Sequence, residues 1–231
     1  MRELEFDVYA SDGVADGAPV VVLLHGRGAT KEDLRVLRPH LPAGVIAVFP
    51  QAPFEAAPWG YGPGWAWYRY LGEDRPEPES FAASLDALEE WLRDLPGALP
   101  VKPGPVALGG FSQGGTLSTA YALTHPGHIA AVLNFSGFLA NHPRIRVAPD
   151  TVAGTRFFWG HGTRDPNIPF ALAERGQALL RGAGAALEAR NYPIGHWIDP
   201  TELQDATRWL EAALAEAAGN TRAGPADSTP G

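Results

Sequence analysis

The chain has 231 residues, 45% of them hydrophobic, and a formal net charge of −8 at pH 7. A chain of this length and composition can bury a substantial core as one α/β domain, with little room for a large inserted cap. The acidity, and the lack of any run of lysine or arginine, argue against nucleic acid as a partner. The absence of cysteine excludes a thiol nucleophile, disulfides and cysteine-ligated metal sites.

The first residues alternate polar and apolar side chains, which predicts an exposed antiparallel edge strand over 2–9. They lack the apolar core of a signal peptide, and no apolar run approaches membrane-spanning length. We therefore expect a cytoplasmic protein that does not insert into membranes.

Two continuous apolar runs, 19–24 and 45–50, are typical of strands buried on both faces. Between them, Thr30 and Asp33 form a variant capping box, which predicts a helix through Arg38. The segment 53–71 is irregular and rich in aromatic side chains.

Strands and helices alternate through the rest of the chain. The expected helices are 79–94, 116–124, 170–181 and 201–218, and the expected strands are 106–111, 129–135, 155–160 and 185–192. This alternation predicts an α/β protein with a doubly wound, mainly parallel sheet and helices on both faces. We expect one domain over residues 1–218 and a disordered tail over 219–231.

Ser112 lies between glycines at the junction of a predicted strand and a predicted helix. Gly110-x-Ser112-x-Gly114 matches the nucleophile-elbow pattern G-x-S-x-G in this context. Residues without a Cβ relieve crowding at such a sharp turn, and the helix N-terminus offers N–H groups where an oxyanion would form. A glycine-rich connection whose serine only caps the helix is the alternative.

A serine nucleophile needs a base and an orienting acid, in the chain order Ser, Asp or Glu, His. Seven histidines compete for the base, and we favour His196 because it lies in a loop after the last strand. For the acid we favour Asp165, which follows a predicted strand, although it could form an Asx turn before proline. Three other acidic residues are candidates. We expect Asp150 to lie at the wrong edge of the sheet, Asp199 to cap the last helix and Glu174 to face outward on a helix.

Two backbone N–H groups are expected to form the oxyanion hole. Gln113 directly follows the serine, and Arg27 lies between glycines in the loop after the first buried strand. Because these donors are backbone groups, neither side chain need be essential. His25 and His161 each end a strand and are expected to brace loops. They could join His196 in a metal site, but no metal-binding spacing supports one, so we expect no metal and no cofactor.

Taken together, these residues resemble the phospholipase/carboxylesterase family of α/β hydrolases, which includes the acyl-protein thioesterases. Gly109–Gly115 matches the family's G-G-F-S-Q-G-G elbow, and Leu23–Ala29 is similar to its L-H-G-x-G oxyanion loop in the bacterial form. His161–Pro169 is similar to H-G-x-x-D-x-x-V-P, which implies Asp165 as the acid. His196 sits where the family carries its base.

The resemblance implies an α/β-hydrolase fold with no large cap domain. Ala66-Trp67-Tyr68 is similar to the family's A-W-Y/F element beside the acyl pocket, but Arg69 follows where the family often has an acidic residue. Aromatic core under a long loop is the other interpretation of this segment. The expected substrate-binding residues are Trp65, Trp67, Tyr68, Ile168 and Trp197.

The sequence therefore predicts a serine carboxylesterase that acts on small-molecule esters with short to medium acyl chains. A thioesterase or lysophospholipase for longer acyl chains is the alternative within hydrolases. A non-catalytic ligand-binding module is the alternative from another class. The oligomeric state, including a homodimer, stays open.

Overall fold

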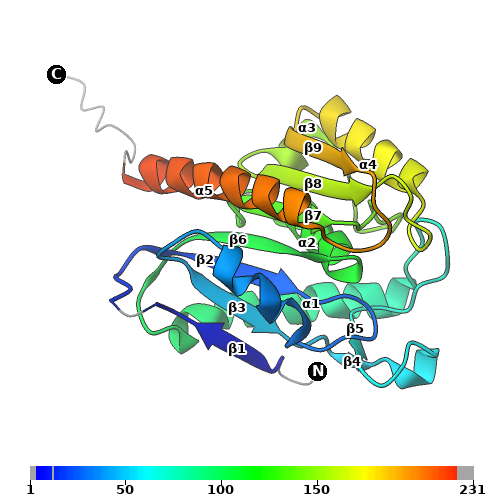
Figure 1. Cartoon of the computed structure of the whole chain (residues 1–231), viewed down its shortest axis with the longest axis horizontal. Helices are drawn as coiled ribbons and strands as arrows, with labels where there is room; N and C mark the ends of the chain where they lie inside the picture. The colour runs from blue at the N-terminus through cyan, green and yellow to red at the C-terminus, as the bar shows by residue number, and fades with distance from the viewer. Residues whose placement is uncertain (1–3, 12, 223–231) are drawn as a thin grey trace.

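The computed structural model describes residues 4–11 and 13–222, and its centre is a seven-stranded sheet in the order β1-β3-β2-β6-β7-β8-β9 (Figure 1). β1 pairs antiparallel with β3 at one edge, and the other pairs are parallel. The predicted fold class is confirmed. The strands are β1 Phe6–Tyr9, β2 Ala18–Leu24, β3 Ile46–Pro50, β6 Pro103–Phe111, β7 Ala131–Phe135, β8 Arg156–Gly162 and β9 Ala186–Tyr192.

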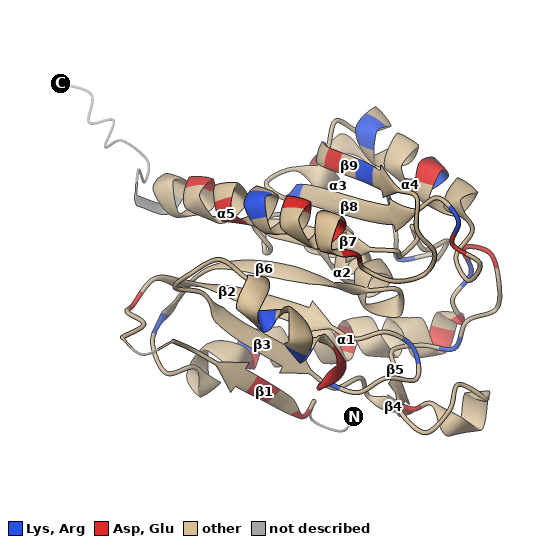
Figure 2. Ribbon diagram, in the orientation of Figure 1, with Lys and Arg blue, Asp and Glu red and all other residues tan. Residues whose placement is uncertain are grey.

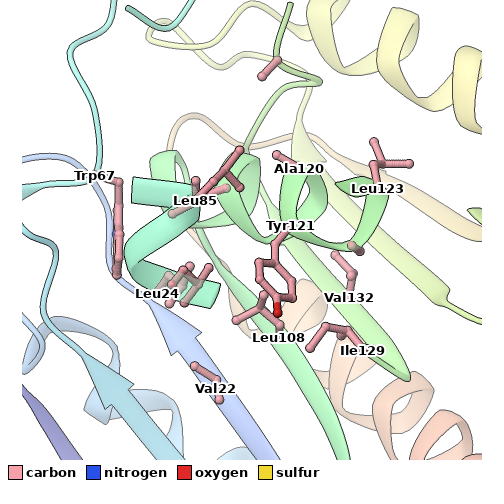
Figure 3. Close-up of a cluster of buried hydrophobic side chains, with 14 of the residues drawn as sticks. Val22, Leu24, Trp67, Leu85, Leu108, Ala120, Tyr121, Leu123, Ile129 and Val132 are labelled. Carbon is pink, nitrogen blue, oxygen red and sulfur yellow. The ribbon is translucent and has the colours of Figure 1, made fainter. Parts of the chain in front are cut away.

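Helices cover both faces of the sheet because most of its strands are apolar on both sides. The longer helices are α1 Pro78–Asp94, α2 Gln113–Thr124, α4 Phe170–Gly182 and α5 Pro200–Arg222. α1, α2 and α4 pack into one hydrophobic cluster, part of which Figure 3 shows, with Tyr121 beside Leu108 and Ile129. α5 and the 3-10 helix η1 (Asp33–His40) pack into a second cluster on the opposite face.

Short elements complete the chain between these units. They are the two-stranded ribbon of β4 Phe54–Glu55 and β5 Trp65–Ala66, the 3-10 helices η2 Ala57–Trp59 and η3 Leu95–Ala98, and α3 Pro149–Val152. The ribbon and η2 lie within the aromatic segment that the sequence leaves irregular.

The predicted capping box at Thr30 is wrong. The helix begins at Asp33, it is capped by Glu32 without a side-chain hydrogen bond, and it is a 3-10 helix. The Thr30 hydroxyl instead accepts a hydrogen bond from the Glu32 backbone N–H at 3.3 Å. The buried residues Leu34 and Leu37 are three apart, a spacing that suits the three residues per turn of a 3-10 helix.

The last helix extends past its predicted end. α5 runs to Arg222, so the tail expected from residue 219 begins inside this helix, and residues 223–231 lie outside the described residues. Across residues 4–11 and 13–222, no helix is both long and apolar enough to cross a membrane. Figure 2 shows Lys and Arg scattered along the chain, with Asp and Glu between them.

The chain reverses its direction of winding between β2 and β6. β2 pairs with β3 on one side and with β6 on the other, and from β6 the strands proceed in sequence order to β9. Loops that leave the carboxyl ends of two such strands diverge, and ligands of doubly wound sheets bind in the resulting crevice. The loop at His25 and the turn at Ser112 both follow these ends.

Candidate active site

Ser112 occupies a strained turn between β6 and α2. Its backbone angles, φ 55° and ψ −112°, lie in a region that residues with a side chain rarely adopt. A Cβ at Gly110 or at Gly114 would collide with the backbone carbonyl oxygen of Leu24. Glycine at both positions therefore lets the turn approach β2 closely, as the sequence pattern predicts.

A chain of hydrogen bonds joins Ser112, His196 and Asp165. His196 Nδ1 lies 2.6 Å from Asp165 Oδ2, and His196 Nε2 lies 3.0 Å from Ser112 Oγ. Because an ionised carboxylate only accepts, Nδ1 carries the proton and donates it to Asp165. Nε2 is then free to accept a hydrogen bond from the serine hydroxyl. The imidazole also packs on the ring of Phe111, with the ring centres 4.6 Å apart.

The Asp165 carboxylate is fixed from its other side as well. Its Oδ1 accepts hydrogen bonds from the backbone N–H groups of Asn167 at 2.8 Å and Ile168 at 2.9 Å. Burial would raise the pKa of Asp165, but hydrogen bonds from His196 and these N–H groups outweigh it and hold the pKa below its ordinary value. The loop after β8 therefore presents an ionised carboxylate to the imidazole.

His25 and His161 brace loops, as the sequence predicts. His25 Nε2 accepts from the Ala52 backbone N–H at 3.1 Å and Nδ1 donates to the Gly26 carbonyl at 2.7 Å, while burial lowers the pKa of His25 to about 4. His161 Nε2 donates to the Ile168 carbonyl at 3.0 Å, and burial lowers its pKa too. Both rings therefore stay neutral near pH 7.

The other histidines do not approach Ser112 within hydrogen-bond distance. His40 and His128 are exposed, His125 contacts Glu89, and His142 bonds to the Pro78 carbonyl. No group of three or more His, Asp or Glu side chains in the described part of the chain is arranged to hold a metal ion.

The competing acids have other partners. Asp150 pairs with Arg146, and Glu174 is exposed on α4. Asp199 caps α5, because its Oδ1 accepts from the Glu202 backbone N–H at 2.8 Å. Of the four acids considered, Asp165 alone contacts the imidazole of His196.

The two expected oxyanion donors follow adjacent strands. Gln113 is the first residue of α2, so its N–H has no acceptor within the helix, and Arg27 lies in the turn after β2. Within the described residues, neither backbone N–H donates to another protein group. Both donors are therefore available to an oxygen atom bound beside Ser112.

The side chain of Gln113 does more than the sequence indicates. It is buried, its Oε1 accepts from the Trp67 backbone N–H at 3.0 Å, and its Nε2 donates to the Tyr68 carbonyl at 2.7 Å. The Trp67 indole N–H donates to the His25 carbonyl at 3.0 Å. These bonds join the aromatic segment to the start of α2, at Gln113, and to the loop after β2, at His25.

A cavity of about 30 Å³ opens beside Ser112. Two of the expected substrate-binding residues, Tyr68 and Ile168, line it. The other three do not: Trp67 is fully buried in the core, Trp65 is half-buried in β5, and Trp197 is exposed beside His196. The remaining lining residues are Arg27, Tyr70, Gln113, Phe138 and Asn167.

The sequence gives no reason to select three of these lining residues. Phe138 follows β7 in a loop without a motif, Tyr70 is one aromatic residue among many, and Asn167 lies in a turn beside the acid. Only the folded arrangement of three loops brings them to Ser112.

Comparisons with known proteins identify the family of the chain. The model of the phospholipase/carboxylesterase family matches residues 11–214. A probable carboxylesterase of Oryza sativa is 28% identical over 206 residues, which cover 84% of this chain and 77% of the rice protein. Acyl-protein thioesterase 1 of Cryptococcus neoformans is 26% identical over 221 residues, covering 84% of this chain and 92% of the fungal protein.

A solved structure extends the comparison to three dimensions. The Bacillus cereus carboxylesterase superposes with a TM-score of 0.77 at 21% identity, covering 91% of this chain and 94% of that one. At this identity the likeness concerns the fold. The family match covers nearly all of the described chain, so the protein belongs to the phospholipase/carboxylesterase family of α/β hydrolases and is a carboxylic ester hydrolase.

Proposed function

We propose that this enzyme hydrolyses carboxylic esters with short to medium acyl chains through an acyl-enzyme on Ser112. The observation that carries the proposal is the hydrogen-bonded chain from Ser112 Oγ to His196 Nε2, at 3.0 Å, and from His196 Nδ1 to Asp165 Oδ2, at 2.6 Å. A serine hydroxyl at its ordinary pKa is a weak nucleophile, and such a chain supplies the base that activates it.

Acylation begins when Ser112 Oγ attacks the ester carbonyl carbon and its proton passes to His196 Nε2. The imidazolium is stabilised by the ionised Asp165, which lies against its other nitrogen. His196 then gives the proton to the departing alkoxide, so an alcohol leaves and the acyl group stays on Ser112.

Deacylation repeats the transfer with water. A water molecule gives a proton to His196 Nε2 as its oxygen attacks the acyl carbon. His196 returns that proton to Ser112 Oγ when the acyl–serine bond breaks. The products are the carboxylic acid and the free enzyme.

The negative oxygen of both tetrahedral intermediates would lie against the backbone N–H groups of Arg27 and Gln113. Their freedom from other protein acceptors supports this role. One such donor contributes on the order of 10²- to 10³-fold to kcat. Replacing either side chain leaves the donor in place, so side-chain variants report on other functions of these residues.

The size of the cavity supports a short acyl group. At about 30 Å³, it holds only a few heavy atoms, and the rigid side chains of Tyr68 and Phe138 limit its expansion. Short acyl chains fit within it, and longer chains must extend past its rim. This favours activity that declines as the acyl chain lengthens.

A panel of p-nitrophenyl esters of increasing acyl length tests the proposal. The expected result is a maximum at short chains and a loss of at least about 10³-fold in Ser112→Ala. Ser118→Ala is the matched control, because the Ser118 hydroxyl is buried in α2 and donates only to the Gly114 carbonyl. Near-normal activity in Ser112→Ala would contradict the proposal.

A thioesterase acting on longer acyl chains is the second candidate. It is favoured by the similarity to proteins described as acyl-protein thioesterases. Matched long-chain oxygen esters and thioesters separate the two, since a higher kcat/KM for the long thioester would favour this candidate. A chain that fails to react with a fluorophosphonate at Ser112 would instead be a non-catalytic binding module.

We further propose that the substrates are small-molecule esters and that the enzyme works in the cytoplasm. The lack of cysteine and of a run of basic residues supports both proposals. Sedimentation of the purified chain would show whether it forms a homodimer.

A further inference from the structure

The side chain of Arg27 lines the cavity beside Ser112 without an acidic partner. Its Cζ lies 4.6 Å from the centre of the Tyr61 ring, a cation–π contact, and its positive charge acts on the hydroxyls of Tyr68 and Tyr70, which line the same cavity. Throughout the described ranges, no carboxylate lies within ion-pair distance of this guanidinium. Arg69, the other exposed arginine nearby, pairs with Glu77 at 3.4 Å.

A second polar group in the same cavity lacks a well-formed hydrogen bond. Tyr68 is fully buried and lines the cavity, and its hydroxyl lies beside the Thr116 side chain without a hydrogen bond of normal length and angle. Burial raises the pKa of Tyr68, and the Thr116 hydroxyl and then the positive charge of Arg27 oppose this shift, so the guanidinium lies close enough to Tyr68 to interact with it. A buried hydroxyl without a well-formed hydrogen bond is destabilising, and an acceptor atom of the substrate would supply that bond.

The position of the cavity shows which half of an ester it can receive. The leaving alcohol takes its proton from His196 Nε2 and must therefore depart on the imidazole side of Ser112. His196 does not line the cavity, whereas Ser112 and Gln113 do. The cavity therefore lies on the acyl side, and a group that meets Arg27 there belongs to the acid half of the ester.

We propose that Arg27 and Tyr68 form a carboxylate-binding subsite, which makes the enzyme selective for half-esters of short dicarboxylic acids. The acyl chain passes through the small cavity, and its terminal carboxylate accepts hydrogen bonds from the guanidinium and the tyrosine hydroxyl. Hydrolysis converts the half-ester and water into an alcohol and a dicarboxylic acid. This inference rests on the proposed esterase function of Ser112.

Two methyl esters of nearly equal size test the subsite. Monomethyl succinate carries a terminal carboxylate, and methyl levulinate carries a neutral methyl ketone in its place. Both release methanol and a proton, so a pH-stat measures both reactions. We expect kcat/KM for the half-ester to exceed that for the neutral ester by about tenfold, the value of a charged hydrogen bond.

The variants attribute that preference to Arg27. Arg27→Gln keeps the backbone N–H, and we expect it to lower the ratio of the two kcat/KM values by about tenfold. Arg27→Lys should retain part of the ratio, and Tyr68→Phe should lower it. Arg69→Gln is the matched control and should leave the ratio unchanged, because Arg69 does not line the cavity.

The outcomes separate this inference from the function on which it rests. Hydrolysis of both esters with no preference in the wild type, or a ratio that changes by less than about threefold in Arg27→Gln, would overturn the inference alone. Failure of the wild type to hydrolyse either ester, or undiminished hydrolysis by Ser112→Ala, would overturn the esterase function and the inference with it.

Discussion

The side chain of Gln113 accepts a hydrogen bond from the backbone N–H of Trp67, with 3.0 Å between the two atoms. The two residues are 46 positions apart in the chain. The same amide donates to the Tyr68 carbonyl. The residue after the proposed nucleophile thus holds one wall of the cavity beside Ser112 in place, so hydrogen bonds join the cavity to the elbow.

Loss of this amide should loosen the cavity wall. Gln113→Ala leaves the Trp67 N–H and the Tyr68 carbonyl buried and unpaired, at roughly 1–3 kcal/mol for each group. We expect urea unfolding to show the corresponding loss of stability. We also expect kcat/KM for a short-chain ester to fall although the backbone N–H of residue 113 remains. A variant with wild-type stability and wild-type kcat/KM would contradict this.

Asp165 should be needed to hold the tautomer and orientation of the His196 ring. In Asp165→Asn the side-chain amide no longer offers a carboxylate to His196 Nδ1–H, so the imidazole loses the acceptor that fixes its tautomer. We expect kcat to fall by about 10³- to 10⁴-fold while the thermal unfolding midpoint changes little.

Asp199→Asn is the matched control for that variant. Asp199 is close to His196 in sequence but caps α5, and asparagine caps a helix about as well as aspartate. Activity within a few-fold of wild type is expected, about the range of other surface substitutions. An equal loss of kcat in both variants would show that the loss in Asp165→Asn does not come from its hydrogen bond with His196.

Glu202 should make the protein less stable as the pH rises. Its side chain is fully buried beside Gly160, and neither carboxylate oxygen has a hydrogen-bond partner within the described structure. Burial, together with the charge of Asp199, raises its pKa from 4.5 to about 8. The folded protein therefore keeps this proton between pH 4.5 and 8, whereas the unfolded chain releases it.

The consequence is a loss of stability on going from mildly acidic to mildly basic solution. The Glu202 contribution to the free energy of unfolding should fall by about 3 kcal/mol between roughly pH 5 and pH 8, and change little above its folded pKa. Glu202→Gln removes the titration and keeps the shape. Denaturant unfolding of both proteins across this range should show that the free energy of unfolding of the variant exceeds that of the wild type by an amount that grows as the pH rises. A difference in free energy of unfolding that stays constant with pH would contradict the raised pKa of Glu202.

Much of the site could be predicted because its residues lie at the carboxyl ends of strands. Apolar runs locate β2, β6 and β8, and chemically distinctive residues follow each of them, so Ser112 and Asp165 meet at one edge of the sheet. The elbow packs so closely against β2 that its flanking positions have no room for a Cβ, and the glycines there therefore identify the elbow in the sequence.

The cavity could not be predicted, because its walls depend on tertiary packing. Trp67 and Tyr68 are adjacent, yet Trp67 packs in the core and bonds to the His25 carbonyl, whereas Tyr68 lines the cavity. Phe138 and Asn167 reach the cavity from separate loops without any local pattern. The burial of Glu202 likewise depends on contact between α5 and Gly160.

The most direct test of the account is covalent labelling of the folded enzyme with a fluorophosphonate, followed by peptide mass spectrometry. The expected result is one label per chain, on the hydroxyl of Ser112, with loss of esterase activity in proportion to labelling. Ser112→Ala should take up no label, and Ser118→Ala should be labelled like the wild type. Inactivation with the label on another residue, or full activity in a chain labelled at Ser112, would contradict it.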